Sequence, residues 1–248
     1  MTLISSRQNP AIKAVCALHN AKGRLEQQCF IAQGLRTVAT FLHHAFVPEA
    51  LYVTPEMQQA AQQEGINNFQ LVTSDVMQKM STTETPSGIL AVFKIPKTPP
   101  SSTIRSGLVL AQISDPGNMG TLIRTCAAMG FKTVVIVEGC DPWSPKVIQA
   151  SAGTIALVNI FSWNWQELVA NKGNTKLCAL VVSSGKKPEE LDLHNSLLVV
   201  GNEAQGLPQE WAEQCEQKMT IPMPGNTESL NAAVAGSIAL YLAALKLH

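Results

Sequence analysis

The sequence predicts an α/β protein whose larger part is a doubly wound parallel sheet. Hydrophobic residues make up 46% of the 248 residues and charged residues only 15%, the balance of a chain with a large buried interior. Near-continuous apolar runs of strand length alternate with helix-like stretches after residue 106. Parallel strands that are buried on both faces and joined by crossover helices produce this alternation.

Five strands are expected in this larger part, with helices between them and a final uncharged helix. The strands are placed at residues 107–113, 133–139, 155–161, 177–184 and 196–202. The helices are placed around residues 118–129, 144–152, 163–172 and 208–216, with the final helix at 229–245. Apolar side chains of that last helix recur on one face, which favours burial in a core or dimer interface over a membrane span. These side chains are Val234, Ala235, Ile238, Tyr241, Leu242 and Leu245.

A stretch rich in Pro and Ser, "PKTPPSSTIRS" at 96–106, separates this part from a smaller α/β region. The smaller region contains short β-like runs at residues 29–34, 49–53, 69–73 and 88–95. Helix-like runs occur between them at residues 35–44, 56–65 and 74–81. The sequence therefore predicts a domain over 1–98, a linker over 99–106 and a second domain over 107–248.

Charge and cysteine spacing limit the function classes. Lys and Arg equal Asp and Glu in number, so no global basic field indicates a nucleic-acid partner. The first 36 residues are locally basic, which fits an anionic partner or simply a solvated face. The six cysteines are far apart and form no C-x-x-C pair, so neither disulfides nor a metal site is predicted and a reducing cytoplasm is expected. Met1 leads directly into polar residues, so no signal peptide is expected.

The segment "DPGNMGTLIR" at 115–124 places one arginine early in a predicted helix. Asn118 is expected to cap this helix and Gly130 to end it. Arg124 lies off the apolar stripe and four residues after Gly120, so its side chain is expected to lean back over that glycine. This pattern fits a capped surface helix and, equally, a cationic pocket for phosphate.

Two further glycine-containing loops follow predicted strands. In "LLVVGNEAQGLP" at 197–208, Gly201 is expected to let a ligand approach the backbone. Glu203 is expected either to begin a helix or to orient a polar ligand. In "IPMPGNTESLNAAVAG" at 221–236, the residues around the prolines predict a stiff apolar wall. Either Thr227 or Ser229 caps the last helix, or Ser229 and Asn231 face a substrate.

Together these three segments resemble the motifs of the SpoU-type RNA ribose methyltransferases of the SPOUT superfamily. The motif N-x-G-x-x-x-R is matched at 118–124, G-N-E-x-x-G-L at 201–207, and I-P-M followed by S-L-N-A-A-V-A at 221–235. Order and spacing match across about residues 107–246. The amino-terminal region is similar to the substrate-binding domain of members that act on ribosomal RNA, which resembles a small ribosomal protein. Relatives usually carry a glutamate where this chain has Gln33.

The resemblance implies a cofactor, an assembly and a set of site residues. It implies S-adenosyl-L-methionine bound in a deep trefoil knot near the carboxyl end of the sheet, in a cytoplasmic homodimer whose active site lies near the interface. The cofactor site would then include Gly201, Asn202, Ile221, Met223 and Leu230. The methyl group and the ribose would be surrounded by Asn118, Arg124, Glu203, Ser229 and Asn231. RNA would contact Arg7, Lys13, Arg24 and Arg36.

The predicted function is therefore S-adenosylmethionine-dependent 2′-O-methylation of ribosomal RNA of the 23S type, without metal. Transfer RNA as the substrate, a non-catalytic RNA-binding module and a small-molecule α/β enzyme are the alternatives. A guanidinium with a pKa above about 12 is a poor general base. We therefore expect Arg124 to hold a phosphate and stabilise the developing alkoxide while the phosphate or water takes the proton.

Overall fold

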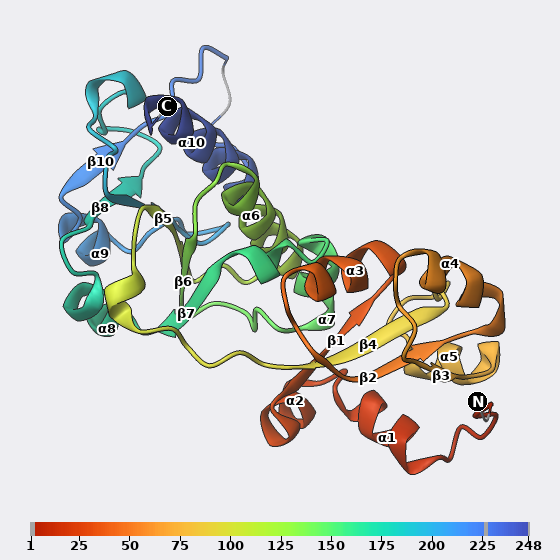
Figure 1. The fold of residues 1–248 in the computed structure, drawn as a ribbon. Helices are drawn as coiled ribbons and strands as arrows, with labels where there is room; N and C mark the ends of the chain where they lie inside the picture. Colours follow the sequence, from red (N-terminus) through yellow and green to blue (C-terminus); the bar gives the residue numbers. More distant parts are fainter. Residues whose placement is uncertain (1–2, 226–227, 248) are drawn as a thin grey trace. The chain divides into compact units, whose positions relative to one another are not determined.

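The computed structural model describes residues 3–225 and 228–247, which form two compact units (Figure 1). The first unit contains the residues up to Pro96 together with Trp143–Ala156. The second contains Lys97–Pro142 and the residues from Leu157 onward. The segment Trp143–Ala156, which the sequence analysis placed within the second domain, therefore packs with the first unit.

The first unit is built on a mixed four-stranded sheet with the order β1-β4-β2-β3. Strand β4 is antiparallel to both β1 and β2, and β3 is parallel to β2. Its strands are β1 (Cys29–Gln33), β2 (Pro48–Val53), β3 (Gln70–Leu71) and β4 (Ile89–Lys94). Its helices are α1 (Pro10–Ala17), α2 (Ala21–Gln27), α3 (Leu35–His43), α4 (Gln58–Gln63), α5 (Ser74–Met80) and α7 (Pro145–Ala150), with the 3₁₀ turn η1 (Pro55–Met57).

The two faces of this sheet carry different cores. Cys29 and Ile31 point to one face and pack in an aliphatic cluster with residues of α1 and α5. Phe30 points to the other face, where its ring lies 5.2 Å from Phe41 and 4.9 Å from Trp143 between centroids. Trp143 thus completes an aromatic core, which explains why its segment belongs to the first unit.

The second unit is a six-stranded sheet with the order β10-β8-β9-β5-β6-β7, in which every recorded pair is parallel. This confirms the predicted α/β class with a parallel sheet. Its strands are β5 (Gly107–Ala111), β6 (Thr133–Val137), β7 (Asn159–Trp163), β8 (Lys176–Leu180), β9 (Ser196–Val200) and β10 (Gln217–Met219). Its helices are α6 (Pro116–Ala128), α8 (Trp165–Asn171), α9 (Gln209–Glu213) and α10 (Ala232–Leu247), with the 3₁₀ turns η2 (Ser101–Thr103) and η4 (Pro188–Glu190).

Helices cover both faces of this parallel sheet, as a doubly wound fold requires. Helices α6 and α10 lie side by side on one face (Figure 1). Their close approach depends on Gly236, because a Cβ atom there would lie 2.4 Å from Leu122 Cδ2. On the other face, Trp165 of α8 stacks on Trp211 of α9 with a centroid distance of 4.7 Å. No helix among the described residues has the length and apolar character to cross a membrane.

Local chemistry moves several element boundaries from their predicted places. Helix α6 begins at Pro116, because Asp115 Oδ1 accepts the Asn118 backbone N–H at 2.7 Å and acts as the N-cap. The expectation that Asn118 caps this helix is therefore wrong, whereas Gly130 follows its end with a φ of 81° as expected. Residues 154–157 form the 3₁₀ turn η3 (Thr154–Leu157), so β7 begins later than predicted.

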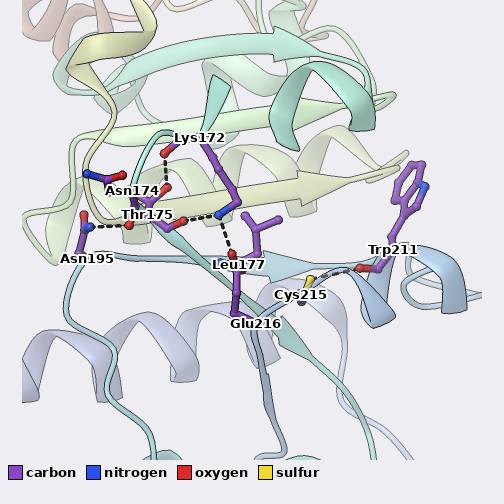
Figure 2. A network of polar contacts seen from close by, with 8 residues as sticks. All are labelled: Lys172, Asn174, Thr175, Leu177, Asn195, Trp211, Cys215 and Glu216. Atoms are coloured by element: carbon purple, nitrogen blue, oxygen red, sulfur yellow. Dashed lines mark hydrogen bonds and ion pairs between the residues drawn. The ribbon is translucent and has the colours of Figure 1, made fainter. Parts of the chain in front are cut away.

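An ion pair and several hydrogen bonds occupy the amino ends of the parallel strands (Figure 2). Lys172 Nζ donates to Glu216 Oε1 at 2.6 Å and to the Thr175 carbonyl at 2.8 Å. Glu216 Oε2 accepts the Leu177 backbone N–H at 2.7 Å, so the carboxylate holds β8 beside β10. Partial burial raises the pKa of Glu216, but these hydrogen bonds outweigh it and the pKa lies below its usual value. We call Lys172, Thr175, Leu177 and Glu216 the amino-edge network.

Candidate active site

The opposite, carboxyl edge of the sheet carries a polar cluster around Glu203, in the turn that follows β9. Asn202 and Gly206 exchange backbone hydrogen bonds of 3.0 and 2.9 Å across this turn. Gly201 begins the turn, and a Cβ there would lie 2.3 Å from the backbone N of Leu207. Gly201 is therefore required by its own loop, whereas the sequence analysis expected it to make room for a ligand.

The Glu203 carboxylate binds the loop that precedes α6. It accepts the backbone N–H groups of Ser114 and Asp115 at 3.4 and 3.2 Å, and the Ser114 hydroxyl at 3.2 Å. Asn118 Nδ2 donates to Glu203 Oε1 at 3.0 Å. Partial burial raises the pKa of Glu203, but the bonds from Asn118 and the backbone outweigh it and lower the pKa below its usual value. The carboxylate is therefore ionised at neutral pH and its charge is used to hold two loops together.

Asn118 extends the cluster to the start of α10. Its Oδ1 accepts from Asn231 Nδ2 at 3.2 Å, and Asn231 Oδ1 accepts the backbone N–H groups of Ala233 and Val234 at 2.9 and 3.2 Å. Asn231, rather than Ser229, is thus the residue that caps the last helix, and Thr227 lies outside the described residues. We call Glu203, Asn118 and Asn231 the polar chain, because hydrogen bonds between their side chains join all three motif segments.

An apolar pocket lies at the neighbouring carboxyl ends of β8 and β10. Its cavity volume is ≈ 90 Å³, and it is open to solvent. Ser229 also lines this pocket. Three predicted cofactor residues are among its lining, whereas Gly201 and Asn202 are not among the described residues that form it. The apolar lining is Leu180, Val181, Val182, Met219, Ile221, Met223, Leu230 and Ala235.

The Asn202 side chain holds its own turn and ties it to the loop after β5. Its Nδ2 donates to the Gln112 carbonyl at 2.8 Å, and its Oδ1 accepts the backbone N–H groups of Ala204 and Gln205. Any contact of Asn202 with a cofactor is therefore left to its backbone.

Arg124 stands apart from the polar chain. It lies six residues after Asn118 on α6, about 9 Å further along the helix axis. Its side chain is exposed and makes no hydrogen bond or ion pair with the residues that the structure describes. The guanidinium is thus available to an anionic ligand, but this chain alone does not bring it to the polar chain.

The predicted RNA-contacting cations of the first unit have different environments. Arg24 is only 5% exposed, and its Nη1 donates to the Leu18 carbonyl at 2.9 Å. This arginine stabilises the turn between α1 and α2, so we remove it from the candidate RNA contacts. Arg7 is exposed and pairs with Asp75 at 3.4 Å, while Lys13 and Arg36 are exposed.

Gln33 has a structural task in the first unit. Its Oε1 accepts the Ser81 hydroxyl at 2.7 Å, and its Nε2 donates to Thr82 Oγ1 at 2.6 Å. The amide thus fixes the loop between α5 and β4. A glutamate would keep the acceptor but lose the donor to Thr82.

Two observations concern the Cys140 thiol and the arrangement of metal-binding side chains among the described residues. Burial, with a smaller effect of Asp141, raises the pKa of Cys140 to about 11, so this thiol stays protonated at neutral pH. Within the described ranges, no group of three His, Cys, Asp or Glu side chains is arranged to hold a metal ion.

The profile of the SpoU rRNA Methylase family matches residues 106–241, more than half of the chain and all of the polar chain. The protein belongs to the SpoU rRNA methylase family. A second profile, the MRM3-like substrate binding domain, matches residues 9–91.

Relatives of this SpoU methylase extend over nearly its whole length. An uncharacterized tRNA/rRNA methyltransferase of Synechocystis sp. is 31% identical over 253 residues, covering 96% of this chain and 92% of the relative. A 23S rRNA (guanosine(2553)-2′-O)-methyltransferase of Bacillus subtilis is 28% identical and covers 97% and 98% of the two chains. The AdoMet-bound rRNA methyltransferase from Sinorhizobium meliloti superposes with a TM-score of 0.87 at 27% identity, over 100% of this chain and 98% of that one.

Sequence reasoning about this SpoU methylase missed residues that act through their backbone or their strand. Ser114 and Asp115 donate their backbone N–H groups to Glu203, which their residue types do not reveal, and the Ser114 hydroxyl donates to the same carboxylate. Leu180 and Met219 line the pocket because β10 pairs with β8. A three-residue strand is too short to show periodicity, so only the general rule that ligands gather at carboxyl strand ends pointed there.

Proposed function

We propose that this protein transfers the methyl group of S-adenosylmethionine to a ribose 2′-hydroxyl of ribosomal RNA. The observation that carries the proposal is the apolar pocket of β8 and β10 beside the polar chain, in the motif order of the SpoU family. The relatives support it, because one is named a 23S rRNA 2′-O-methyltransferase and another was crystallised with AdoMet.

The residues present fit this cofactor in two respects. The pocket offers apolar surface from Ile221, Met223 and Leu230, which suits one face of an adenine ring. The Glu203 carboxylate is neutralised by no Lys or Arg among the described residues, and its charge favours a cation such as a sulfonium. When bound, S-adenosylmethionine supplies an electrophilic methyl group.

The polar chain and Arg124 would divide the remaining work. Asn118 and Asn231 carry the amides that can orient a ribose, and Glu203 is a positioning residue that holds Asn118. Arg124 binds the neighbouring phosphate and stabilises the developing alkoxide, and the phosphate or water takes the hydroxyl proton. Ser229 lines the pocket and would contact both ligands.

The path of the last strands supports a deep trefoil knot. Strand β9 lies between β8 and β5, so the chain passes beyond β8 to form β10 at the sheet edge. It then returns to place α10 against α6 and β9. We propose that this return closes the knot around the cofactor pocket.

We also propose a homodimer. Helix α10 buries its small residues against α6 and leaves Val234, Tyr241 and Leu245 at 48%, 53% and 59% exposure. A second copy would cover this apolar face. Sedimentation should show a dimer for the wild type and a monomer for the double variant Tyr241→Asp/Leu245→Asp, and a monomeric wild type would contradict the proposal.

The first unit would bind the RNA as a ribosomal-protein-like domain, through exposed cations that include Lys13 and Arg36. Binding should weaken steeply as salt rises. Such an enzyme acts in the cytoplasm, where its ribosomal substrate is made.

The deciding experiment maps 2′-O-methyl groups in RNA from a strain that lacks the protein. We expect one ribosomal site to be lost and transfer RNA to be unchanged. The purified protein should then restore that site, and it should bind S-adenosylhomocysteine in calorimetry. Unchanged ribosomal RNA together with a lost transfer-RNA methyl group would favour the tRNA alternative, and no binding at millimolar S-adenosylhomocysteine would favour a non-catalytic module.

Arg124→Ala and Arg124→Lys test the role of the guanidinium. We expect Arg124→Ala to reduce turnover at saturating RNA by about 100-fold, and Arg124→Lys to recover part of it. Wild-type turnover with weaker RNA binding alone would exclude a direct part in the reaction.

A further inference from the structure

A second hollow lies on the carboxyl edge of the parallel sheet, at the ends of β6 and β7. It is an open surface hollow with a volume of ≈ 440 Å³. The sheet order places the apolar pocket at β10 and β8, the polar chain at β9 and β5, and this hollow at β6 and β7. The polar chain therefore has a pocket on each side.

Contacts connect the wall of the hollow to the loops that hold the polar chain. Cys140, in its wall, donates its backbone N–H to the Ile113 carbonyl at 2.9 Å, and its Sγ lies 3.6 Å from Met119 Sδ. Gln112 Nε2 donates to Glu138 Oε2 at 3.1 Å, and the Gln112 carbonyl accepts from Asn202 in the Glu203 turn. One glutamine thus joins the wall of the hollow to the turn that holds the polar chain.

The lining suits a flat ring that carries hydrogen-bond donors. Trp163 is half-buried, with its ring packed at 4.9 Å on Phe161, and Pro142 and Ile136 add apolar surface. The described residues that line the hollow include three carboxylates (Glu138, Asp141 and Glu167) and no Lys or Arg, so its walls do not favour a phosphate. Aromatic stacking combined with polar edge contacts is how proteins hold unstacked RNA bases.

The acceptor at the rim distinguishes the bases. Glu138 is exposed, and Gln112 is its one hydrogen-bond partner in the described ranges, so Oε1 is free to accept from a ligand. A carboxylate can accept two parallel N–H groups. Guanine presents two adjacent donors, N1–H and the N2 amino group, on its Watson–Crick edge. Adenine and cytosine place an acceptor beside their amino group, and uracil places its imino group between two carbonyls.

We propose that this hollow receives the base of the methylated nucleotide and selects guanine, stacked on Trp163 and paired with Glu138. The centres of the polar chain and the hollow are separated by two strand spacings, about 10 Å, which a nucleoside spans from its ribose to the far edge of its base. The inference rests on the proposed function and adds the identity of the substrate base to it.

The test uses single-stranded 15-nucleotide RNAs that differ only in a central G, A, C or U, with S-adenosylhomocysteine present. For the wild type we expect Kd for the G strand to be roughly 10-fold lower than for the others. Glu138→Gln should reduce this preference to less than two-fold. Trp163→Ala should weaken binding of all four strands by roughly 10-fold, and Trp163→Phe should restore most of it.

Glu189→Gln is the matched control, because Glu189 is exposed on η4 and does not line the hollow. Every variant should bind S-adenosylhomocysteine like the wild type in calorimetry, which shows that the fold and the cofactor pocket are intact. Equal binding of the four strands by the wild type, no binding of any of them, or a G preference that survives Glu138→Gln overturns the inference. If ribosomal RNA is still methylated in those cases, the proposed function stands; if the wild type neither binds S-adenosylhomocysteine nor methylates RNA, the proposed function fails instead.

Discussion

Two glutamates at opposite edges of the parallel sheet each use a carboxylate, but for different purposes. Glu216 at the amino edge pairs with the Lys172 ammonium and with one backbone N–H of β8. Glu203 at the carboxyl edge accepts from a hydroxyl, two side-chain amides and two backbone N–H groups, all neutral. Both have a pKa below the usual value. A perturbed pKa alone therefore does not separate a site residue from a structural one.

The two glutamates differ in whether their negative charge is already balanced by a positive one. The charge of Glu216 is already balanced by Lys172, so the pair can only fix β8 and β10. The charge of Glu203 is unbalanced within the described residues, and its donors come from the loop and helix that also hold Asn118. A carboxylate held by neutral donors fixes geometry and still presents its charge to a ligand.

The largest contrast is expected in catalysis. Glu203→Gln keeps the size of the side chain but places an NH₂ group against backbone donors, so the loop before α6 and Asn118 should shift. We expect initial rates of RNA methylation to fall by about 100-fold. Glu216→Gln, the matched change at the other edge, should remain within two-fold of the wild type. Equal losses of methylation rate in the two variants would contradict the assignment of Glu203, but not Glu216, to the active site.

Stability should also respond to the change at the amino edge. Hydrogen bonds to charged groups contribute about 1.5–3 kcal/mol when buried, but Glu216 is 43% exposed and solvent screens its pair with Lys172. We therefore expect Glu216→Gln to lower the free energy of unfolding by about 1 kcal/mol. Urea denaturation would measure this, with Glu189→Gln as the control. An unfolding free energy of Glu216→Gln equal to that of Glu189→Gln would contradict the structural role of Glu216.

Both carboxylates should make the free energy of unfolding depend on pH in the acid range. Since each pKa is lowered from an ordinary value of 4.5 in the folded state, their stabilisation is complete above that pH. This stabilisation is lost as pH falls through the lowered pKa values of the folded state, because protonation then favours the unfolded chain. The free energy of unfolding of Glu203→Gln/Glu216→Gln should consequently change less with pH below 4.5 than that of the wild type. Parallel curves for the two proteins would contradict the assigned causes.

The smallest effect is expected at Asn195, beside the amino-edge network (Figure 2). Asn195 Nδ2 donates to the Asn174 carbonyl at 2.9 Å on the surface. Its φ of 53° lies in the left-handed region, which glycine adopts without strain. Asn195→Gly should change the free energy of unfolding by less than about 0.5 kcal/mol, and a larger change in urea denaturation would give this surface bond more weight than we assign.

Much of the second unit could be predicted because its strands are buried on both faces. Apolar runs such as 133–137 have a composition that fits a parallel interior strand, and α6 buries the expected stripe of Met119, Leu122 and Ile123. Asn118, Glu203 and Asn231 were brought together by motif resemblance, and the structure shows their hydrogen bonds. Their individual roles remain predictions.

What the sequence could not show depends on pairing across space. The cap of α6 is an exception that the sequence could have shown, because Pro favours the first helical position and Pro116 therefore points to Asp115 rather than Asn118 as the N-cap. In the sequence Arg24 cannot be distinguished from an exposed arginine, because only the folded turn around Leu18 buries it. The same holds for Trp143, whose ring finds Phe30 more than a hundred residues earlier in the chain.

The place of Trp143 has a consequence for the construction of chimaeras. A hybrid that exchanged only the residues before the linker for those of another family member would leave Phe30 without its own aromatic partner. The foreign sheet would then have to accept a helix and a tryptophan that were selected against a different surface. The unit that can be exchanged is discontinuous, so the residues up to Pro96 and the segment Trp143–Ala156 have to be exchanged together.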